Sequence, residues 1–218
     1  MTDNHIMIFD TETTGLPKNW RAPMTDLDNW PRVIQLAWML VDLDGNVLNT
    51  QEILIKPNGW EIPKEPFWIE HGFDTEISLR DGKPLQEAME IFLPDLRRCA
   101  FLVSHNMDFD HKVLGAEMLR LGLRSGRKTT RICTKEASTD YCKIPFEGQR
   151  RYFTASTKRY KWPKLTELHV HLFGKDFDNA HQAGGDVAAL KVCLFELIKR
   201  GVIQLVLQDE SSPQNPTT

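Results

Sequence analysis

The chain has 218 residues, 41% of them hydrophobic, and its 27 basic and 30 acidic side chains leave a formal net charge of -3. This composition is typical of a folded globular protein and excludes a chain that is disordered throughout. The near-neutral balance also excludes a protein that coats nucleic acid by bulk charge, although a local basic groove stays compatible with it.

The four cysteines are widely spaced and form no C-x-x-C pair, which favours reduced thiols in a cytoplasmic protein. The start of the chain, MTDNHIMIFD, lacks the basic and apolar regions of a signal peptide. Because no run of 18 apolar residues occurs, we expect no contact with a membrane. We expect a single domain over residues 1–207, followed by a disordered polar tail at 208–218.

Apolar patterning predicts a strand at 5–9, directly before the turn-like DTETTG, and then a polar loop at 19–31. Two strands follow around Asp44-Gly45-Asn46, a strong hairpin signal. Strands and helices then alternate: a helix within 63–98 with Leu85, Met89, Phe92 and Leu96 on one face, a strand at 100–104, a helix at 108–121, a strand at 131–134, and helices near 164–173 and 184–200. This order predicts an α/β fold with a mixed sheet and helices packed on its faces.

Asp10 and Glu12 are the sharpest local feature of the sequence. Side chains on a strand alternate between faces, so the two carboxylates lie on one face. Two like charges at such a short distance are unfavourable unless a cation lies between them, and Mg²⁺ or Mn²⁺ prefers such oxygen ligands. The alternative is an acidic turn whose side chains bond the backbone ahead of Gly15. The D-x-E pattern alone does not decide between the two.

Two later segments place further acids at helix starts. Asp110 follows the buried strand in SHNMDFDHKVL, and Asp186 follows a glycine pair in HQAGGDVAAL, five residues after His181. Loops at strand ends and helix starts are where α/β folds gather catalytic groups. Taken singly, however, Asp110 and Asp186 are each better explained as helix caps.

Taken together, the order D-x-E, H-N-x-x-F-D and H-x(4)-D over about residues 5–200 resembles the DEDDh exonuclease family. Its members include the proofreading subunit of bacterial replicative polymerases, ribonuclease T and the TREX exonucleases. The resemblance implies a ribonuclease H-like fold, with a mixed five-stranded sheet whose N-terminal strands are antiparallel and whose remainder is parallel, and helices on both faces. It also implies 3′→5′ hydrolysis of phosphodiester bonds by two Mg²⁺ or Mn²⁺ ions, releasing nucleoside 5′-monophosphates.

The resemblance assigns a role to each matching residue. Asp10 would bridge the ions, Glu12 and Asp186 would complete the site that activates water, and Asp110 would hold the second ion. His181 would be the general base, a task suited to an imidazole that titrates near neutrality. Three other residues would line the pocket of the 3′-terminal nucleotide, with the leucine against its base: Thr13, Gly15 and Leu16.

Some nearby residues have a different interpretation. His105 and Asn106 are expected to order the strand-to-helix turn, and Asn106 is also a candidate substrate contact. The family motif aligns its metal ligand with Asp110 and not with Asp108. His169 and His171 lie two residues apart on a helix and therefore face different directions, so we expect no metal pair there.

Residues 143–164 are rich in basic and aromatic side chains. Seven Lys or Arg against one Glu give this segment a charge of +6, and five aromatic residues lie among the charges. This composition is typical of single-strand binding, with Arg150 and Arg151 as candidate contacts. The alternative is a solvated loop whose aromatic side chains pack onto the core.

We expect a single-stranded 3′ end as the substrate, with DNA favoured over RNA. The alternatives are a 3′-end trimming exoribonuclease with the same site, or a proofreading or accessory subunit that binds nucleic acid beside a polymerase. Because only 18 residues follow Arg200, we favour a freestanding enzyme. A homodimer and association with a polymerase or a sliding clamp stay open.

Overall fold

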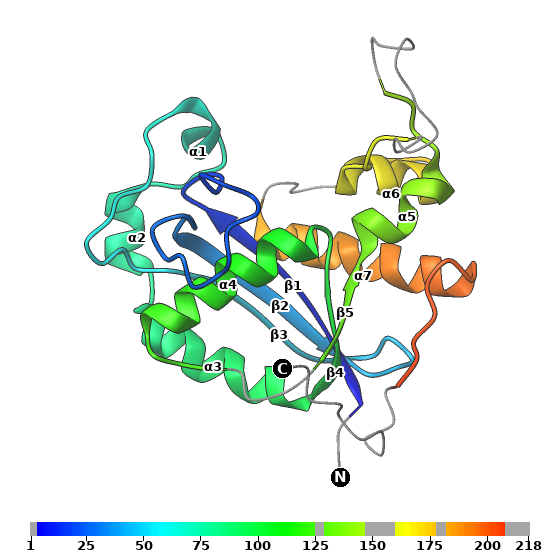
Figure 1. The fold of residues 1–218 in the computed structure, drawn as a ribbon, viewed down its shortest axis with the longest axis horizontal. Coiled ribbons are helices and arrows are strands. Elements are labelled where there is room, and N and C mark those ends of the chain that lie inside the picture. Colours follow the sequence, from blue (N-terminus) through cyan, green and yellow to red (C-terminus); the bar gives the residue numbers. More distant parts are fainter. Residues whose placement is uncertain (1–3, 125–128, 147–159, 178–181, 208–218) are drawn as a thin grey trace.

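The computed structural model of the chain describes residues 4–124, 129–146, 160–177 and 182–207 (Figure 1). Five strands form one sheet in the order β3-β2-β1-β4-β5. β2 pairs antiparallel with both β1 and β3, whereas β4 pairs parallel with both β1 and β5. The strands are β1 (His5–Thr13), β2 (Val33–Val41), β3 (Val47–Leu54), β4 (Cys99–Ser104) and β5 (Thr130–Cys133). The predicted mixed sheet of the ribonuclease H-like fold is confirmed.

The turn between β2 and β3 lies where the sequence predicts a hairpin. The Asp42 carboxylate accepts hydrogen bonds from the backbone amides of Asp44 and Asn46. Gly45 has a φ of +87°, which a residue with a side chain rarely adopts, and a Cβ there would lie 3.1 Å from the ring of Phe195. The positive φ therefore favours glycine at this turn, and the Phe195 ring leaves little room for a side chain.

Helices cover both faces of the sheet, which divides the core into two layers. β1 supplies both layers by alternation, since Met7 and Phe9 pack toward α3 and α4 while Ile6 and Ile8 pack toward α6 and α7. The helices are α1 (Pro66–Glu70), α2 (Thr75–Asp81), α3 (Leu85–Arg98), α4 (Met107–Arg120), α5 (Thr134–Cys142), α6 (Leu165–Phe173) and α7 (Ala183–Lys199).

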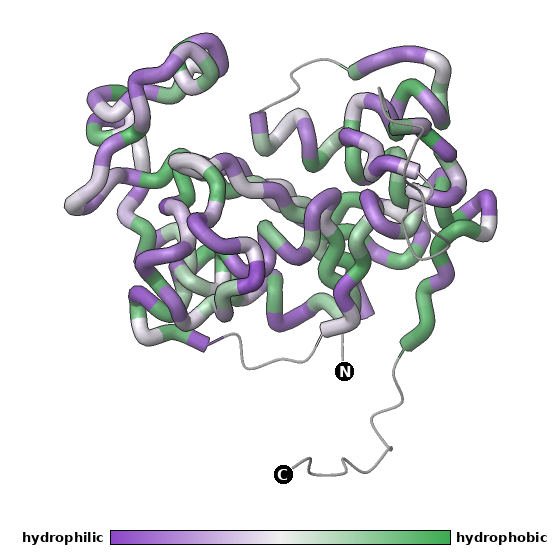
Figure 2. Tube along the Cα trace, turned by 45° about the horizontal axis from the view of Figure 1, so that its top comes forward, coloured by the Kyte–Doolittle hydropathy of each residue, from purple (hydrophilic) through white to green (hydrophobic). Residues whose placement is uncertain are grey.

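Helices lie on both sides of the sheet edge at which β1, β4 and β5 have their carboxyl ends (Figure 1). Figures 1 and 2 place α1 and α2 on one side of this edge and α5 and α6 on the other. Loops at the carboxyl ends of parallel strands meet along one edge of a sheet. Side chains from β1, β4, β5 and their following helices can therefore meet here.

The sequence did not predict three of these helices. α1 has five residues, and α2 depends on Asp74, whose carboxylate accepts from the backbone amides of Glu76 and Ile77. α5 is mostly polar and follows β5 without a turn signal, so apolar periodicity does not reveal it. No helix within the described ranges is long and apolar enough to cross a membrane. The single domain over 1–207 stays a prediction, and the tail at 208–218 lies outside the described residues.

Candidate active site

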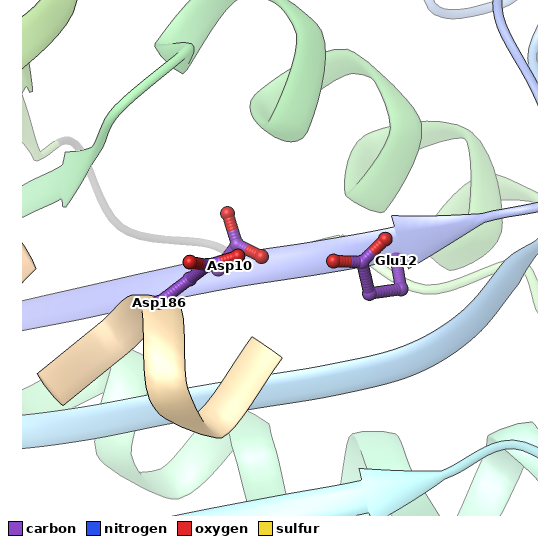
Figure 3. A group of neighbouring side chains, drawn as sticks. All are labelled: Asp10, Glu12 and Asp186. Carbon is purple, nitrogen blue, oxygen red and sulfur yellow. The ribbon is translucent and has the colours of Figure 1, made fainter. Parts of the chain in front are cut away.

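Three carboxylates from two elements meet at the carboxyl end of β1. Asp10 and Glu12 project from one face of the strand, as period two predicts, and Asp186 joins them from the first turn of α7. One carboxylate oxygen of each lies within 4.8 Å of those of the other two. Figure 3 shows Asp186 directly beside Asp10, with Glu12 further along the strand.

Asp110 approaches from α4 and lies outside that group of three. Its side chain is 3% exposed and accepts a hydrogen bond from Thr11 Oγ1 at 2.8 Å. The first residue before α4 is Asn106 and the first before α7 is Gln182, so neither Asp110 nor Asp186 occupies the capping position. Both still lie in the first turn of their helices, where the helix dipole favours a carboxylate.

Burial and mutual repulsion raise the pKa values of these acids. The pKa of Asp10 lies well above its usual value because of burial and then the charges of Asp110, Asp186 and Glu12. Burial, followed by the charges of Asp186 and Asp110, raises the pKa of Glu12 to about 8. Burial raises the pKa of Asp110 to about 6, against the opposing effect of the Thr11 hydrogen bond.

This arrangement fits a divalent cation. Among the described residues, no lysine or arginine forms an ion pair with Asp10, Glu12 or Asp110. Buried carboxylates without a cationic partner are costly, and hard oxygen ligands this close together match the preference of Mg²⁺ or Mn²⁺. The donor set can therefore hold a metal, whereas a structural acidic turn gives no reason for bringing carboxylates of two elements together.

Two side chains of the sheet hold the start of α7, and the sequence analysis missed both. Gln35 Oε1 accepts from the backbone amide of Ala183 at 2.9 Å, and Gln35 Nε2 donates to Glu52 Oε1 at 2.8 Å. A Cβ on Gly184 would contact the carboxylate of Glu52, an exposed and flexible side chain that would have to shift to make room for it. Gln35 is the cross-strand partner of Glu12, a register that the sequence alone does not show.

A buried network holds the loop that follows β1. Glu117, which is 1% exposed, accepts from Arg32 Nε at 2.8 Å and from the backbone amide of Val33 at 3.0 Å. The backbone of Arg32 in turn pairs with Thr14 through Thr14 N to Arg32 O at 2.9 Å and Arg32 N to Thr14 Oγ1 at 3.0 Å. α4 therefore fixes the loop that leaves the acidic strand.

The loop after β1 carries the three residues that we expect to contact a nucleotide. Thr13 Oγ1 donates to Gly15 O at 2.8 Å, and the φ of +148° at Gly15 disfavours any other residue. Leu16 is 72% exposed, so its side chain is free to contact a ligand. The indole Nε1 of Trp68 in α1 donates to Thr13 O at 3.0 Å and so ties α1 to the same loop. The contact of these residues with a nucleotide stays a prediction.

His105 and Asn106 contact more than their own turn. His105 Nε2 bonds Pro163 O at 2.9 Å and Nδ1 bonds Thr134 Oγ1 at 3.0 Å. Burial lowers the pKa of His105 to about 4, so the ring is neutral at physiological pH. Asn106 Oδ1 accepts from Lys135 Nζ at 2.5 Å. These bonds connect β4 to α5 and to the residues before α6.

The remaining sequence candidates divide into two groups. Asp108 pairs with Lys112 on the surface, and His169 is buried with Nδ1 bonded to Lys175 O at 2.8 Å, so neither belongs to the acidic cluster. Three other candidates lie outside the described residues: Arg150, Arg151 and His181.

Comparison with known proteins gives structural matches alone. No family model matches the chain, and no curated protein matches its sequence. Among solved structures, one of E. coli exonuclease I has a TM-score of 0.68 at 16% identity, covering 90% of this chain and 41% of that one. E. coli exonuclease I with a dT13 oligonucleotide has a TM-score of 0.65 at 18% identity, again covering 90% and 41%. A moderately thermophilic exonuclease I from Methylocaldum szegediense has a TM-score of 0.66 at 18% identity, with the same coverage.

The chain thus spans less than half the length of these exonucleases. At such low identity the likeness concerns the fold, and the chain has the ribonuclease H-like fold found in the exonuclease I structures.

Proposed function

We propose that this chain is a metal-dependent 3′→5′ exonuclease that removes nucleotides from single-stranded DNA. The observation that carries the proposal is the approach of the Asp10, Glu12 and Asp186 oxygens to within 4.8 Å of one another, at the carboxyl edge of a sheet shared with exonuclease I. Buried Asp110 stands beside them without a cationic partner among the described residues. The negative charges of these four acids repel one another, and bound cations would offset this repulsion.

Each acid has a distinct part in this proposal. Asp10, with neighbours on both sides, would be shared between two cations, Glu12 and Asp186 would complete one site, and Asp110 would contribute to the other. Cations bound there would supply the charge that stabilises the attacking and leaving oxygens of a phosphoryl displacement. His181, two residues before the start of α7, would accept the proton of the attacking water.

The remaining residues would bind the end of the strand. Leu16 would pack against the terminal base, with Thr13 and Gly15 shaping the backbone around it, and Arg150 and Arg151 would bind phosphates further along. Exonuclease I structures contain dT13 and dA16 oligonucleotides, and this supports DNA as the substrate tested first. Products would be nucleoside 5′-monophosphates.

The proposal is tested with one oligonucleotide labelled at either end. A 5′-labelled strand should shorten one nucleotide at a time with Mg²⁺ or Mn²⁺, and a 3′-labelled strand should lose its label in the first step. EDTA and the Asp10→Ala variant should each abolish both changes. Internal fragments, or no cleavage with either metal, would overturn the proposal.

An RNA of the same sequence in the same assay decides whether the enzyme prefers DNA or RNA. We expect faster degradation of DNA, and faster degradation of RNA would show an exoribonuclease with the same site. A duplex with a recessed 3′ end gives a further comparison, because we expect unpaired ends to be preferred.

A further inference from the structure

Lys135 lies at the edge of the sheet that carries the acids, although the sequence analysis assigned it no role. It is the second residue of α5, which begins directly after β5. Its backbone amide donates to His105 O at 3.3 Å at the end of β4. Its ammonium donates to Asn106, whose backbone oxygen accepts from the amide of Asp110 at 3.1 Å. Two hydrogen-bonded steps therefore connect Lys135 to one of the four acids.

The charge of Lys135 has no carboxylate partner among the described residues. Other cations of the molecule do have one, such as Lys112 with Asp108 and Lys161 with Glu167. Lys135 Nζ is held by Asn106 Oδ1 at 2.5 Å and lies 4.2 Å from the ring centroid of Trp162. An ammonium has three donors, and among the described residues the hydrogen bond to Asn106 uses one of them. The other two are available to oxygens of a ligand.

Trp162 adds an aromatic surface beside this cation. Its side chain is 44% exposed although indole is a large apolar group. Aromatic faces next to cations are the combination that binds unpaired bases and phosphates in single strands. The pair is held in place by His105, since its bond to Pro163 O fixes the residue that follows Trp162.

We propose that Lys135 and Trp162 form a binding site for single-stranded nucleic acid next to the acidic cluster. Lys135 would bind a backbone phosphate through its remaining donors, and Trp162 would stack on a base of the same strand. Asn106 would act as a positioning residue that holds the ammonium toward the strand. This inference rests on the proposed exonuclease function and adds the contacts that would orient its substrate.

The test is the binding of a short fluorescent oligothymidylate, measured by anisotropy in Ca²⁺ over a range of KCl concentrations. Lys135→Met should raise Kd about tenfold, as expected for the loss of a charge-assisted contact. It should also reduce the slope of log K against log salt by about 0.7, the value for one phosphate on a single strand. Lys135→Arg should restore most of both, because it keeps the charge.

Trp162→Ala should raise Kd about tenfold, and Trp162→Phe should keep most of the affinity because it keeps a stacking surface. Lys199→Met is the matched control, since Lys199 lies at the far end of α7 and pairs with Glu196. This control should leave Kd and the salt slope unchanged. Thermal denaturation with and without Mn²⁺ should give the wild-type increase in Tm for the Lys135 variants, which shows that the acids are intact.

The outcomes separate this inference from the proposed function. If the wild type shortens DNA from its 3′ end but Lys135→Met binds with the wild-type Kd and salt slope, the inference is wrong and the proposed function stands. If the wild type neither binds nor shortens any oligonucleotide, both are wrong. A tenfold loss that Lys135→Arg does not restore would also overturn the role of Lys135 as a cation.

Discussion

Replacing Glu12 by Gln should stabilise the metal-free protein at pH 8 and weaken its response to metal. The raised pKa of Glu12, about 8 against a usual value of 4.5, means that the folded state holds this proton more tightly than the unfolded chain. Its contribution to stability is therefore fully present below about pH 4.5 and is lost as the pH rises through 8. Glutamine keeps the shape of the side chain and stays neutral as the pH rises, so it does not incur the cost of a negative charge in the cluster.

The size of the effect follows from the same values. A difference of 4.5 against 8 corresponds to at most about 5 kcal/mol, at about 1.4 kcal/mol for each pH unit. Water penetration and relaxation reduce such costs, so we expect Glu12→Gln to gain about 2 kcal/mol in free energy of unfolding at pH 8. For a chain of this size that raises Tm by roughly 5 °C.

Thermal and urea denaturation in EDTA at pH 8 and pH 5 measure this difference. The gain should shrink at pH 5, where wild-type Glu12 is largely protonated. Saturating Mn²⁺ should stabilise the wild type by about 3 kcal/mol at a hundred times its Kd, and the variant by much less. The exposed Glu61→Gln should change neither value. A Glu12→Gln variant that is no more stable than wild type at pH 8 would refute the account of the acidic cluster.

Three further changes test how the site is held. Gly184→Ala places a methyl group against the Glu52 carboxylate, which must shift and loosen its bond to Gln35, so we expect a lower kcat with no more than about 1 kcal/mol of stability lost. Ala188→Gly on the exposed side of α7 should leave kcat unchanged. Glu52→Ala should lower kcat more than it changes KM. Glu52→Gln should restore activity, because its side-chain oxygen still accepts the hydrogen bond from Gln35. Equal activity of the two variants would contradict this role of Glu52. Glu117→Gln should lower the free energy of unfolding, measured in urea, by about 3 kcal/mol, because it leaves Arg32 and Arg120 with a neutral partner. Asp108→Asn at the surface should lower it by less than about 1 kcal/mol. A similar loss in both variants would show that the buried network contributes little to stability.

The sequence predicts those parts of the molecule that depend on local pattern. Alternation on β1 places Asp10 and Glu12 on one face, and apolar spacing predicts α4 and α7 within one residue of their ends. The four strands beyond β1 follow from apolar runs and the hairpin signal. Asp110 and Asp186 required the resemblance to a known family, since each alone looks like a helix cap.

Other features depend on contacts between distant segments and leave no local pattern. Gln35 and Glu52 act on α7 only because the register of three strands places them beside Gly184. Lys135 stands in the polar sequence TKEASTD, which is typical of a solvated helix, and its contacts arise where β4 and β5 end together. Such residues become visible when the topology of the sheet is known.

The most direct test of the central claim is a time course of nucleotide release from a single-stranded DNA with a different base at each end. With Mn²⁺, the wild type should release the 3′-terminal nucleoside 5′-monophosphate first and the others in order, and Asp186→Asn should release none. Release that begins at the 5′ end, products that carry a 3′-phosphate, or undiminished release by Asp186→Asn would contradict the account.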